Sequence, residues 1–182
     1  MFFNQPGENN TDQTLQLACE RGKTLQINEV VVASSKGDTA YLAFEIFKGF
    51  TITVVTYHCG FKQPFQSIMK DSVRKDLESK GMRVVSATHA LSGVERSLSQ
   101  KYSGAYPVLI MADTLRLFGQ GTKVAVEIAI MAADAGMLSG NDIVSIGGTG
   151  KGADTALILS PAGQSHLFDM KIKEIVCKPR NF

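Results

Sequence analysis

Short β-branched runs alternate with segments whose apolar residues recur at helical spacing over most of the chain. Four runs predict buried strands, at residues 29–33, 51–56, 82–86 and 142–146. Periodic segments predict the helices, at residues 11–24, 38–48, 67–80, 92–102, 107–118 and 122–135. This alternation predicts an α/β protein with a mainly parallel sheet between helical layers.

The pattern changes after the fourth run. Residues 155–160 are too few and too β-rich for a helix, so they predict a strand that turns back antiparallel, and residues 171–178 predict one more strand. No stretch of the chain resembles a linker. We therefore expect one domain, residues 1–182, which is long enough to bury roughly 70% of its unfolded surface.

Composition narrows the class of protein. Hydrophobic residues make up 44% of the chain, charged residues 20%, and the net charge is +2, so nothing indicates disorder or a nucleic-acid surface. No apolar run approaches the ~20 residues of a membrane span, and the first residues do not resemble a signal peptide. Three widely spaced cysteines suggest neither a disulfide framework nor a zinc motif, and no other metal-ligand spacing stands out. We expect a cytoplasmic protein without a membrane partner.

Polar residues gather where the first strand ends. This loop consists of Ser34, Ser35, Lys36, Gly37, Asp38 and Thr39. The start of a helix presents free N–H groups and a partial positive charge, so a strand-loop-helix turn of this composition is a candidate phosphate site. In the alternative interpretation, Ser35 or Asp38 only caps the helix and Gly37 relaxes the turn.

A similar string follows the fourth strand. It consists of Gly147, Gly148, Thr149, Gly150, Lys151 and Gly152. The string is not a P-loop, because Gly152 follows Lys151 where Ser or Thr should stand and because a strand comes next. It predicts either a flexible hairpin loop or a glycine flap that closes over a ligand.

Further candidates leave the second and third strands. They are His58, Gly60 and Phe61 after one strand and Thr88 and His89 after the other. Because parallel strands end at the same edge of a sheet, these residues are candidate binding contacts. Cys59 is a poor nucleophile partner for His58, since adjacent residues of an extended chain face opposite ways.

With these elements in order, a family resemblance becomes visible. The strand, Ser-x-x-Gly-x-Thr-Ala turn, helix and strand of residues 30–56 resemble the C-terminal α/β domain of pyruvate kinase, as do residues 125–129 and 136–148. With residues 10–15 and 88–96, the chain is similar to the free-standing, largely prokaryotic family of uncharacterised pyruvate kinase α/β domain-like proteins. The resemblance covers about residues 4–180.

The resemblance implies a three-layer α/β/α sandwich with about five strands in the order 3-2-1-4-5, the last one antiparallel. Strands 1 and 4 are then neighbours, and the winding direction reverses between them. The crevice at such a switch point is where open α/β sheets bind ligands. The loops at 34–39 and 147–152 would both line it.

The resemblance also bears on function. It includes no catalytic barrel, so kinase activity is not implied. In pyruvate kinase this domain is regulatory, and a sugar-phosphate effector places its phosphate in the loop matching residues 34–39. Members of the free-standing family are associated with bound FMN. We therefore expect a phosphorylated small-molecule ligand, with FMN foremost, its ring against His58, Gly60, Phe61, Thr88 or His89.

Two alternatives stay open. The chain can be an effector-binding module for a sugar phosphate that acts through a partner or an oligomer. It can also be an enzyme that uses the bound flavin or a sugar phosphate, although the sequence offers no convincing general base or other catalytic residue. The apolar helix at 107–118 favours a homo-oligomer.

Overall fold

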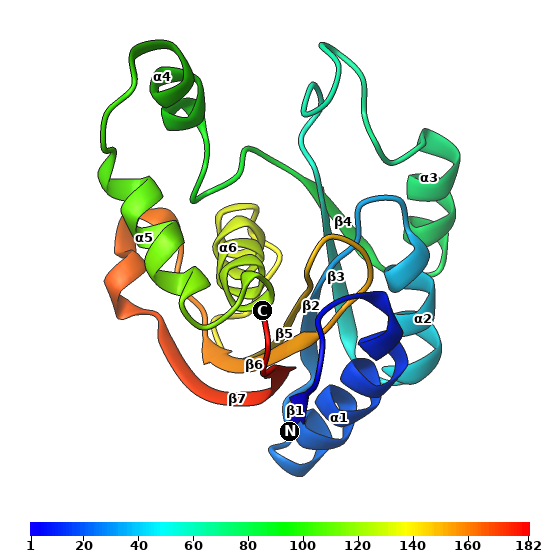
Figure 1. Cartoon of the computed structure of the whole chain (residues 1–182). Helices are drawn as coiled ribbons and strands as arrows, with labels where there is room; N and C mark the ends of the chain where they lie inside the picture. The colour runs from blue at the N-terminus through cyan, green and yellow to red at the C-terminus, as the bar shows by residue number, and fades with distance from the viewer.

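The computed structural model describes residues 1–182 and consists of strands and helices in near alternation (Figure 1). The strands are β1 (Phe2–Phe3), β2 (Glu29–Ala33), β3 (Thr51–Thr56), β4 (Arg83–Ser86), β5 (Ile143–Gly147), β6 (Thr155–Ser160) and β7 (Lys171–Pro179). The helices are α1 (Thr11–Thr24), α2 (Asp38–Ile46), α3 (Asp71–Ser79), α4 (Val94–Tyr102), α5 (Pro107–Arg116) and α6 (Gln120–Asp134). Two 3-10 helices, η1 (Glu8–Asn10) and η2 (Gln164–Asp169), complete the chain.

All strands join one sheet in the order β1-β7-β6-β5-β2-β3-β4. Its central part, from β4 to β6, has the predicted order, with β6 antiparallel to β5 and the other pairs parallel. The α/β sandwich is therefore confirmed, but the sheet has seven strands rather than about five. The expected strand at 171–178 is β7, whereas the two-residue β1 was not predicted, because two residues carry no periodicity and only pairing with β7 makes them a strand.

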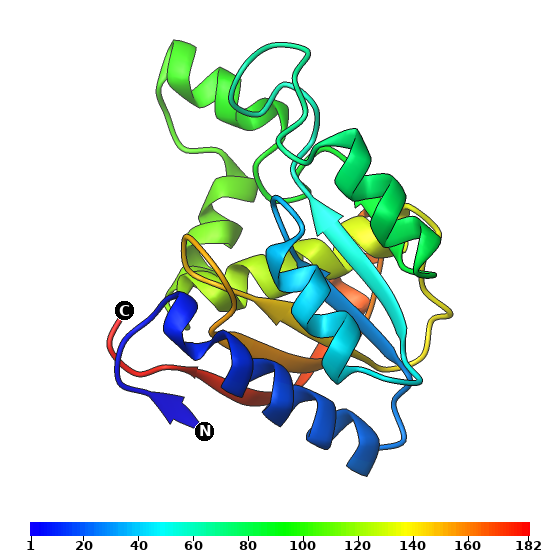
Figure 2. The ribbon, with the colours of Figure 1, turned by 90° about the vertical axis from the view of Figure 1, so that its right-hand side faces the viewer.

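Helices cover both faces of the sheet (Figures 1 and 2). Val30 and Val32 of β2 belong to a core shared with α1 and α2, whereas Val31 points into a second core shared with α6. This alternation, with all three valines buried, is what a strand between two helical layers requires. Helix α6 is apolar on nearly all sides because the sheet lies beneath it and α5 packs against it.

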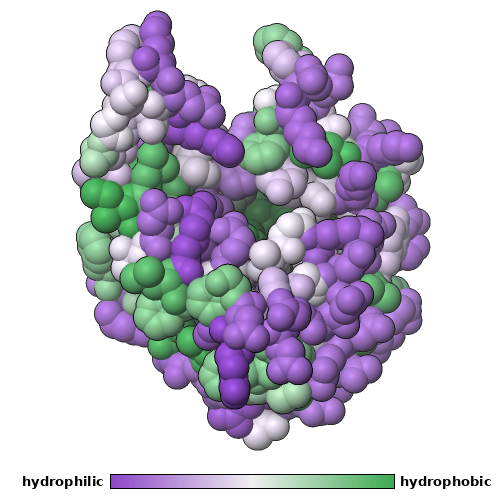
Figure 3. Space-filling view, viewed as in Figure 1, coloured by the Kyte–Doolittle hydropathy of each residue, from purple (hydrophilic) through white to green (hydrophobic).

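The parallel strands bring four loops to one edge of the sheet. There the surface is hollowed between two projections, one formed around α4 and one by the connection from β3 to α3 (Figures 1 and 3). No helix is long and apolar enough to cross a membrane.

Candidate functional site

Two adjoining hollows lie at the carboxyl edge of the sheet. One, of about 240 Å³, is partly apolar, and the other, of about 410 Å³, is lined almost entirely by polar residues. We call them the apolar hollow and the polar hollow, and together the groove. Both are lined by Ser34, Ser35, Thr39, Lys151 and Gly152. The loops after β2 and β5 therefore meet at the boundary between the hollows, at the switch point of the sheet.

The loop of residues 34–39, here called the α2 loop, is shaped by Ser34. Its buried hydroxyl Oγ accepts hydrogen bonds from the N–H groups of Gly37, at 3.2 Å, and Ala40, at 3.3 Å. The alternative interpretation had Ser35 or Asp38 as the cap of α2, but neither side chain caps this helix. Gly37 has φ of +111°, and a Cβ atom there would lie 2.6 Å from Cγ1 of Val73, so this turn requires glycine.

Several amide groups of the α2 loop have no acceptor in the protein. The N–H groups of Ser35 and Lys36 make no hydrogen bond within the chain, and those of Asp38 and Thr39 start α2 without a partner. With the helix dipole behind them, these four N–H groups form a surface that favours an anion.

Charges of both signs surround the polar hollow. Lys36 and Lys151 supply cations, and Glu8, Asp12 and Asp38 supply carboxylates. Lys151 Nζ lies 2.5 Å from Oε2 of Glu8, and this hydrogen bond raises the pKa of the lysine. One of the two cations is thus already paired in the ligand-free chain.

The loop of residues 147–152, here called the glycine loop, is anchored at its base and exposed at its tip. The buried carboxylate of Asp154 accepts hydrogen bonds from the N–H groups of Gly7, at 3.0 Å, and Thr149, at 3.1 Å. Gly152 has φ of +70°, and a Cβ atom there would lie 2.3 Å from Oγ1 of Thr11. Outside the tip at Gly150 and Lys151 the loop is therefore held in place, and the tip is tied through the Lys151 side chain to Glu8.

One buried polar atom of the glycine loop has no partner. The hydroxyl Oγ1 of Thr149 makes no hydrogen bond, although it is shielded from solvent. Leaving a hydroxyl in this state costs about 1–3 kcal/mol, so the loop has a polar group that a ligand or a shift of the loop would satisfy.

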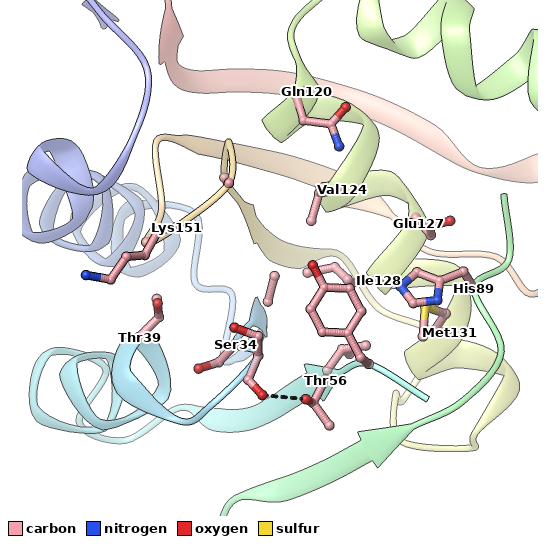
Figure 4. A pocket seen from close by; sticks show the side chains of 17 residues that line it. Ser34, Thr39, Thr56, His89, Gln120, Val124, Glu127, Ile128, Met131 and Lys151 are labelled. Atoms are coloured by element: carbon pink, nitrogen blue, oxygen red, sulfur yellow. Dashed lines mark hydrogen bonds between the residues drawn. The ribbon is translucent and has the colours of Figure 1, made fainter. Parts of the chain in front are cut away.

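The apolar hollow depends on a helix face that the sequence did not single out. Val124, Ile128 and Met131 of α6 line it (Figure 4), and so do Val55 and Tyr57. The spacing of the three α6 residues places them on one side of the helix. This stripe was not visible in the sequence because α6 is apolar on its other sides as well, so periodicity did not mark the face toward the groove.

A buried ion pair supports that side of the apolar hollow. Lys123 and Glu127, one turn apart on α6, are hydrogen-bonded, and Glu127 Oε1 also accepts the N–H of Leu91 at 2.9 Å. Burial lowers the pKa of Lys123. The Glu127 side chain lines the hollow, which gives its wall one charged group among apolar ones (Figure 4).

His58 and His89 meet as the topology requires. Their Nδ1 atoms lie 3.1 Å apart, and His89 lines the apolar hollow. The rings of Tyr57 and Phe61 pack against the His89 ring and stack on each other, with their centroids 4.1 Å apart. Cys59 is exposed and hydrogen-bonds to neither histidine, in keeping with the rejection of a Cys–His pair.

The predicted residues divide into two groups. Those that line a hollow are Ser34, Ser35, Lys36, Asp38, Thr39, His89, Gly148, Gly150, Lys151 and Gly152. Those that do not are Gly37, His58, Gly60, Phe61, Thr88, Gly147 and Thr149. In this second group Gly37 and Gly147 shape their loops, His58 and Phe61 pack around His89, and Gly60 donates its N–H to the Gln66 carbonyl in a turn. Thr88 is exposed beside them.

No three His, Cys, Asp or Glu side chains are placed to hold a metal ion. The groove combines a helix start with unpaired N–H groups, two lysines, an apolar wall and an aromatic and histidine cluster.

Comparison with solved structures finds pyruvate kinases from Cryptosporidium parvum. One matches at 14% identity and TM-score 0.42 over 83% of this chain and 23% of its own length. Another, in complex with ADP, matches at 14% identity and TM-score 0.41 over 86% of this chain and 24% of its own. The chain thus spans about a quarter of the length of these enzymes.

A family model gives the assignment. The pyruvate kinase alpha/beta domain model matches residues 12–159, from the first turn of α1 almost to the end of β6. The matched range contains the α2 loop, the glycine loop and all of α6. The chain belongs to the pyruvate kinase alpha/beta domain family.

Proposed function

We propose that the groove binds a phosphorylated ligand with a flat apolar part, and that this ligand is FMN. The observation that carries the proposal is the row of four unpaired N–H groups at the start of α2, which lies at the boundary between a polar and an apolar hollow. A phosphate held there leaves the rest of the ligand directed along the groove.

The residues of the groove fit the two ends of FMN. The phosphate would meet the amides of the α2 loop, the hydroxyl of Thr39 and the ammonium groups of Lys36 and Lys151. The ring would lie between the stripe on α6 and Tyr57. FMN supplies electron-transfer chemistry when bound, but the groove offers no assigned substrate, so we propose binding and no reaction.

The apolar hollow favours this ligand over a sugar bisphosphate. A sugar presents hydroxyl groups that need partners, and it finds none where Val124, Ile128 and Met131 form the wall, although Gln120 and Glu127 offer them elsewhere in the hollow. An effector-binding module for a sugar phosphate, acting through a partner or an oligomer, is the outcome that would replace our proposal if sugar bisphosphates bind more tightly.

A panel of ligands tests the proposal. The purified chain is mixed with FMN, riboflavin 5′-sulfate, fructose bisphosphate or inorganic phosphate, and its thermal midpoint is recorded. We expect the largest rise with FMN, together with quenching of flavin fluorescence. A larger rise with the sugar bisphosphate would establish the effector module, and no response to any phosphorylated compound would remove the phosphate site.

Variants at opposite ends of α2 locate the phosphate. Lys36→Ala removes a cation beside the unpaired amides, and Lys48→Ala removes an exposed cation just beyond the other end of the helix. We expect weaker FMN binding in the first variant and unchanged binding in the second. Equal effects would mean that net charge, not the α2 loop, sets the affinity.

We also propose that the chain self-associates through α5. Ile110, Leu117 and Phe118 on and just after this helix are 55%, 75% and 50% exposed. Such a concentration of exposed large apolar side chains is typical of an interface. Light scattering should show a dimer or larger species that Leu117→Asp disrupts and Leu25→Asp, at another exposed apolar position, does not. A monomeric wild-type chain would contradict this.

A further inference from the structure

Two loops border the apolar hollow, where the proposed flavin ring would lie, and two histidines join these loops. His58 belongs to the connection from β3 to α3, and His89 belongs to the connection from β4 to α4. Their Nδ1 atoms lie 3.1 Å apart, which is hydrogen-bond distance.

The histidines also hold an aromatic cluster together. The His89 ring lies 5.4 Å from Tyr57 and 5.2 Å from Phe61, and the guanidinium of Arg96, on α4, lies 5.6 Å from the Phe61 ring. Tyr57 and His89 line the apolar hollow. Separating the two histidines would therefore loosen the packing of Tyr57 and His89 at the wall of that hollow. It would also loosen the contact between Phe61 and α4.

The hydrogen bond tolerates only certain protonation states. Between two neutral rings, one Nδ1–H donates to the other Nδ1. One additional proton leaves the bond intact, because an imidazolium N–H donates to the neutral ring. Two additional protons place N–H groups on both Nδ1 atoms, so neither can accept and two positive charges face each other.

Charged groups of α4 and α6 face the pair. Lys123 of α6 and Arg96 of α4 are cations, and Glu127 of α6 is the carboxylate, already hydrogen-bonded to Lys123. Burial of the His89 ring has the largest effect on its pKa and lowers it. Lys123, Arg96 and His58 lower this pKa further, whereas Glu127 raises it. The closed arrangement therefore persists at neutral pH and is lost in acid.

We propose that His58 and His89 form a proton-operated latch over the apolar hollow, closed with at most one additional proton and released by the second. With the latch closed, Tyr57 and His89 line the hollow and Phe61 packs against both of their rings. With the latch open, the connections at 57–70 and 87–93 separate, and the apolar hollow opens to solvent. Ligand release in acid follows if the proposed function holds.

Hydrogen exchange of the ligand-free chain tests the latch without reference to any ligand. Protection of amides in residues 57–70 and 87–93 is measured at pH 7.5 and pH 5.0, corrected for the intrinsic exchange rate. We expect protection to fall severalfold in acid, because the open state binds the second proton more tightly than the closed state does. Protection in α1 and α6 should not change, which excludes global unfolding.

Three histidine variants complete the test. His89→Phe keeps a ring in the cluster but removes the hydrogen bond, so both loops should exchange rapidly at either pH. His58→Phe should do the same and serves if the first variant does not fold. His166→Phe, in η2 and far along the chain, should behave as the wild type. Equal protection of the wild-type loops at both pH values, or loss of the pH effect in His166→Phe, would overturn the latch.

FMN affinity at the two pH values then links the latch to the groove. We expect the affinity to fall between pH 7.5 and pH 5.0 by more in the wild type than in His89→Phe, which keeps only the part caused by protonation of the FMN phosphate itself. A pH-dependent exchange with no FMN binding at any pH would leave the latch standing and refute the proposed ligand. Binding whose pH dependence is as large in His89→Phe as in the wild type would refute the latch and leave the ligand standing.

Discussion

The ammonium group of Lys151 lies 2.5 Å from the carboxylate of Glu8, so the tip of the glycine loop is tied to the segment before α1. Both side chains are largely exposed, at 75% and 52%. A surface pair of this kind adds little to stability. The pair instead fixes the position of Lys151, because it holds the ammonium group beside a carboxylate that competes with a phosphate for this cation.

Replacing Glu8 with glutamine should therefore strengthen ligand binding. In Glu8→Gln the lysine is released to the α2 loop, and FMN affinity should rise roughly two- to fivefold, the range expected for one exposed pair. The thermal midpoint without ligand should stay the same. Lys151→Ala should weaken binding, and an unchanged affinity in both variants would show that the glycine loop does not contact the phosphate.

Gly37 should be the most demanding glycine of the α2 loop. Gly37→Ala combines a left-handed backbone with a Cβ atom 2.6 Å from Val73 Cγ1, and should lower the free energy of unfolding by about 2–4 kcal/mol. Gly49→Ala is the matched control, because φ there is +87° and nothing lies within 4 Å of its Cβ. It should cost about 1 kcal/mol.

A second-site change separates the two causes. Adding Val73→Ala to Gly37→Ala removes the clash but not the backbone strain, so urea denaturation should show part of the loss restored beyond the sum of the single changes. Strict additivity would mean that the clash is relieved elsewhere in the chain.

Asp154 should be a structural anchor rather than a ligand contact. Asparagine would place an amide donor among three donors, the N–H groups of Gly7 and Thr149 and the hydroxyl of Thr155. Asp154→Asn should therefore lower the free energy of unfolding by about 2–4 kcal/mol. Asp142→Asn, which disturbs the more exposed ion pair with Lys173, should cost at most about 1 kcal/mol. Chemical denaturation distinguishes these outcomes, and equal costs would refute the anchor.

Cys177 should make the fold sensitive to alkali. Burial raises the pKa of its thiol to about 11, so the folded chain keeps a proton that the unfolded chain releases above its ordinary pKa of 9.0. The stability contribution is complete below pH 9 and is lost as the pH rises toward 11, by roughly 2–3 kcal/mol. Cys177→Ala should lack this component.

The matched control for this pH effect is Cys59→Ala, at an exposed thiol. Its unfolding free energy should follow the wild-type pH profile. A Cys177→Ala profile that falls as steeply as the wild type between pH 9 and 11 would assign the loss to other groups.

The sheet was predictable because its central strands are buried on both faces and carry continuous β-branched runs such as Val30 to Val32. The α2 loop was predictable because Gly37 and the hydroxyl residues stand where a strand gives way to a helix. The role of Ser34 was not, since a hydroxyl that reaches forward to Gly37 and Ala40 depends on how tightly the loop turns.

The wall of the apolar hollow was beyond sequence reasoning for a different reason. In α6 nearly every side is apolar, so nothing in the pattern separates Ile128, which lines the groove as well as the core, from Ala129, which lies in the core alone. The sequence predicted that His58 and His89 lie at the same edge of the sheet, but it did not predict that they are in contact. Their 3.1 Å contact is set by two loops whose course the strand pattern does not encode.

The central claim is that the start of α2 holds the phosphate of FMN, and comparing FMN with riboflavin by isothermal titration tests it most directly. The two compounds share the ring and differ in the phosphate. We predict that FMN binds at least about tenfold more tightly, as expected for a phosphate held by charge-assisted hydrogen bonds, and that Lys36→Ala narrows the difference while Lys48→Ala does not. Equal affinities for FMN and riboflavin, or no binding of either, would contradict the account.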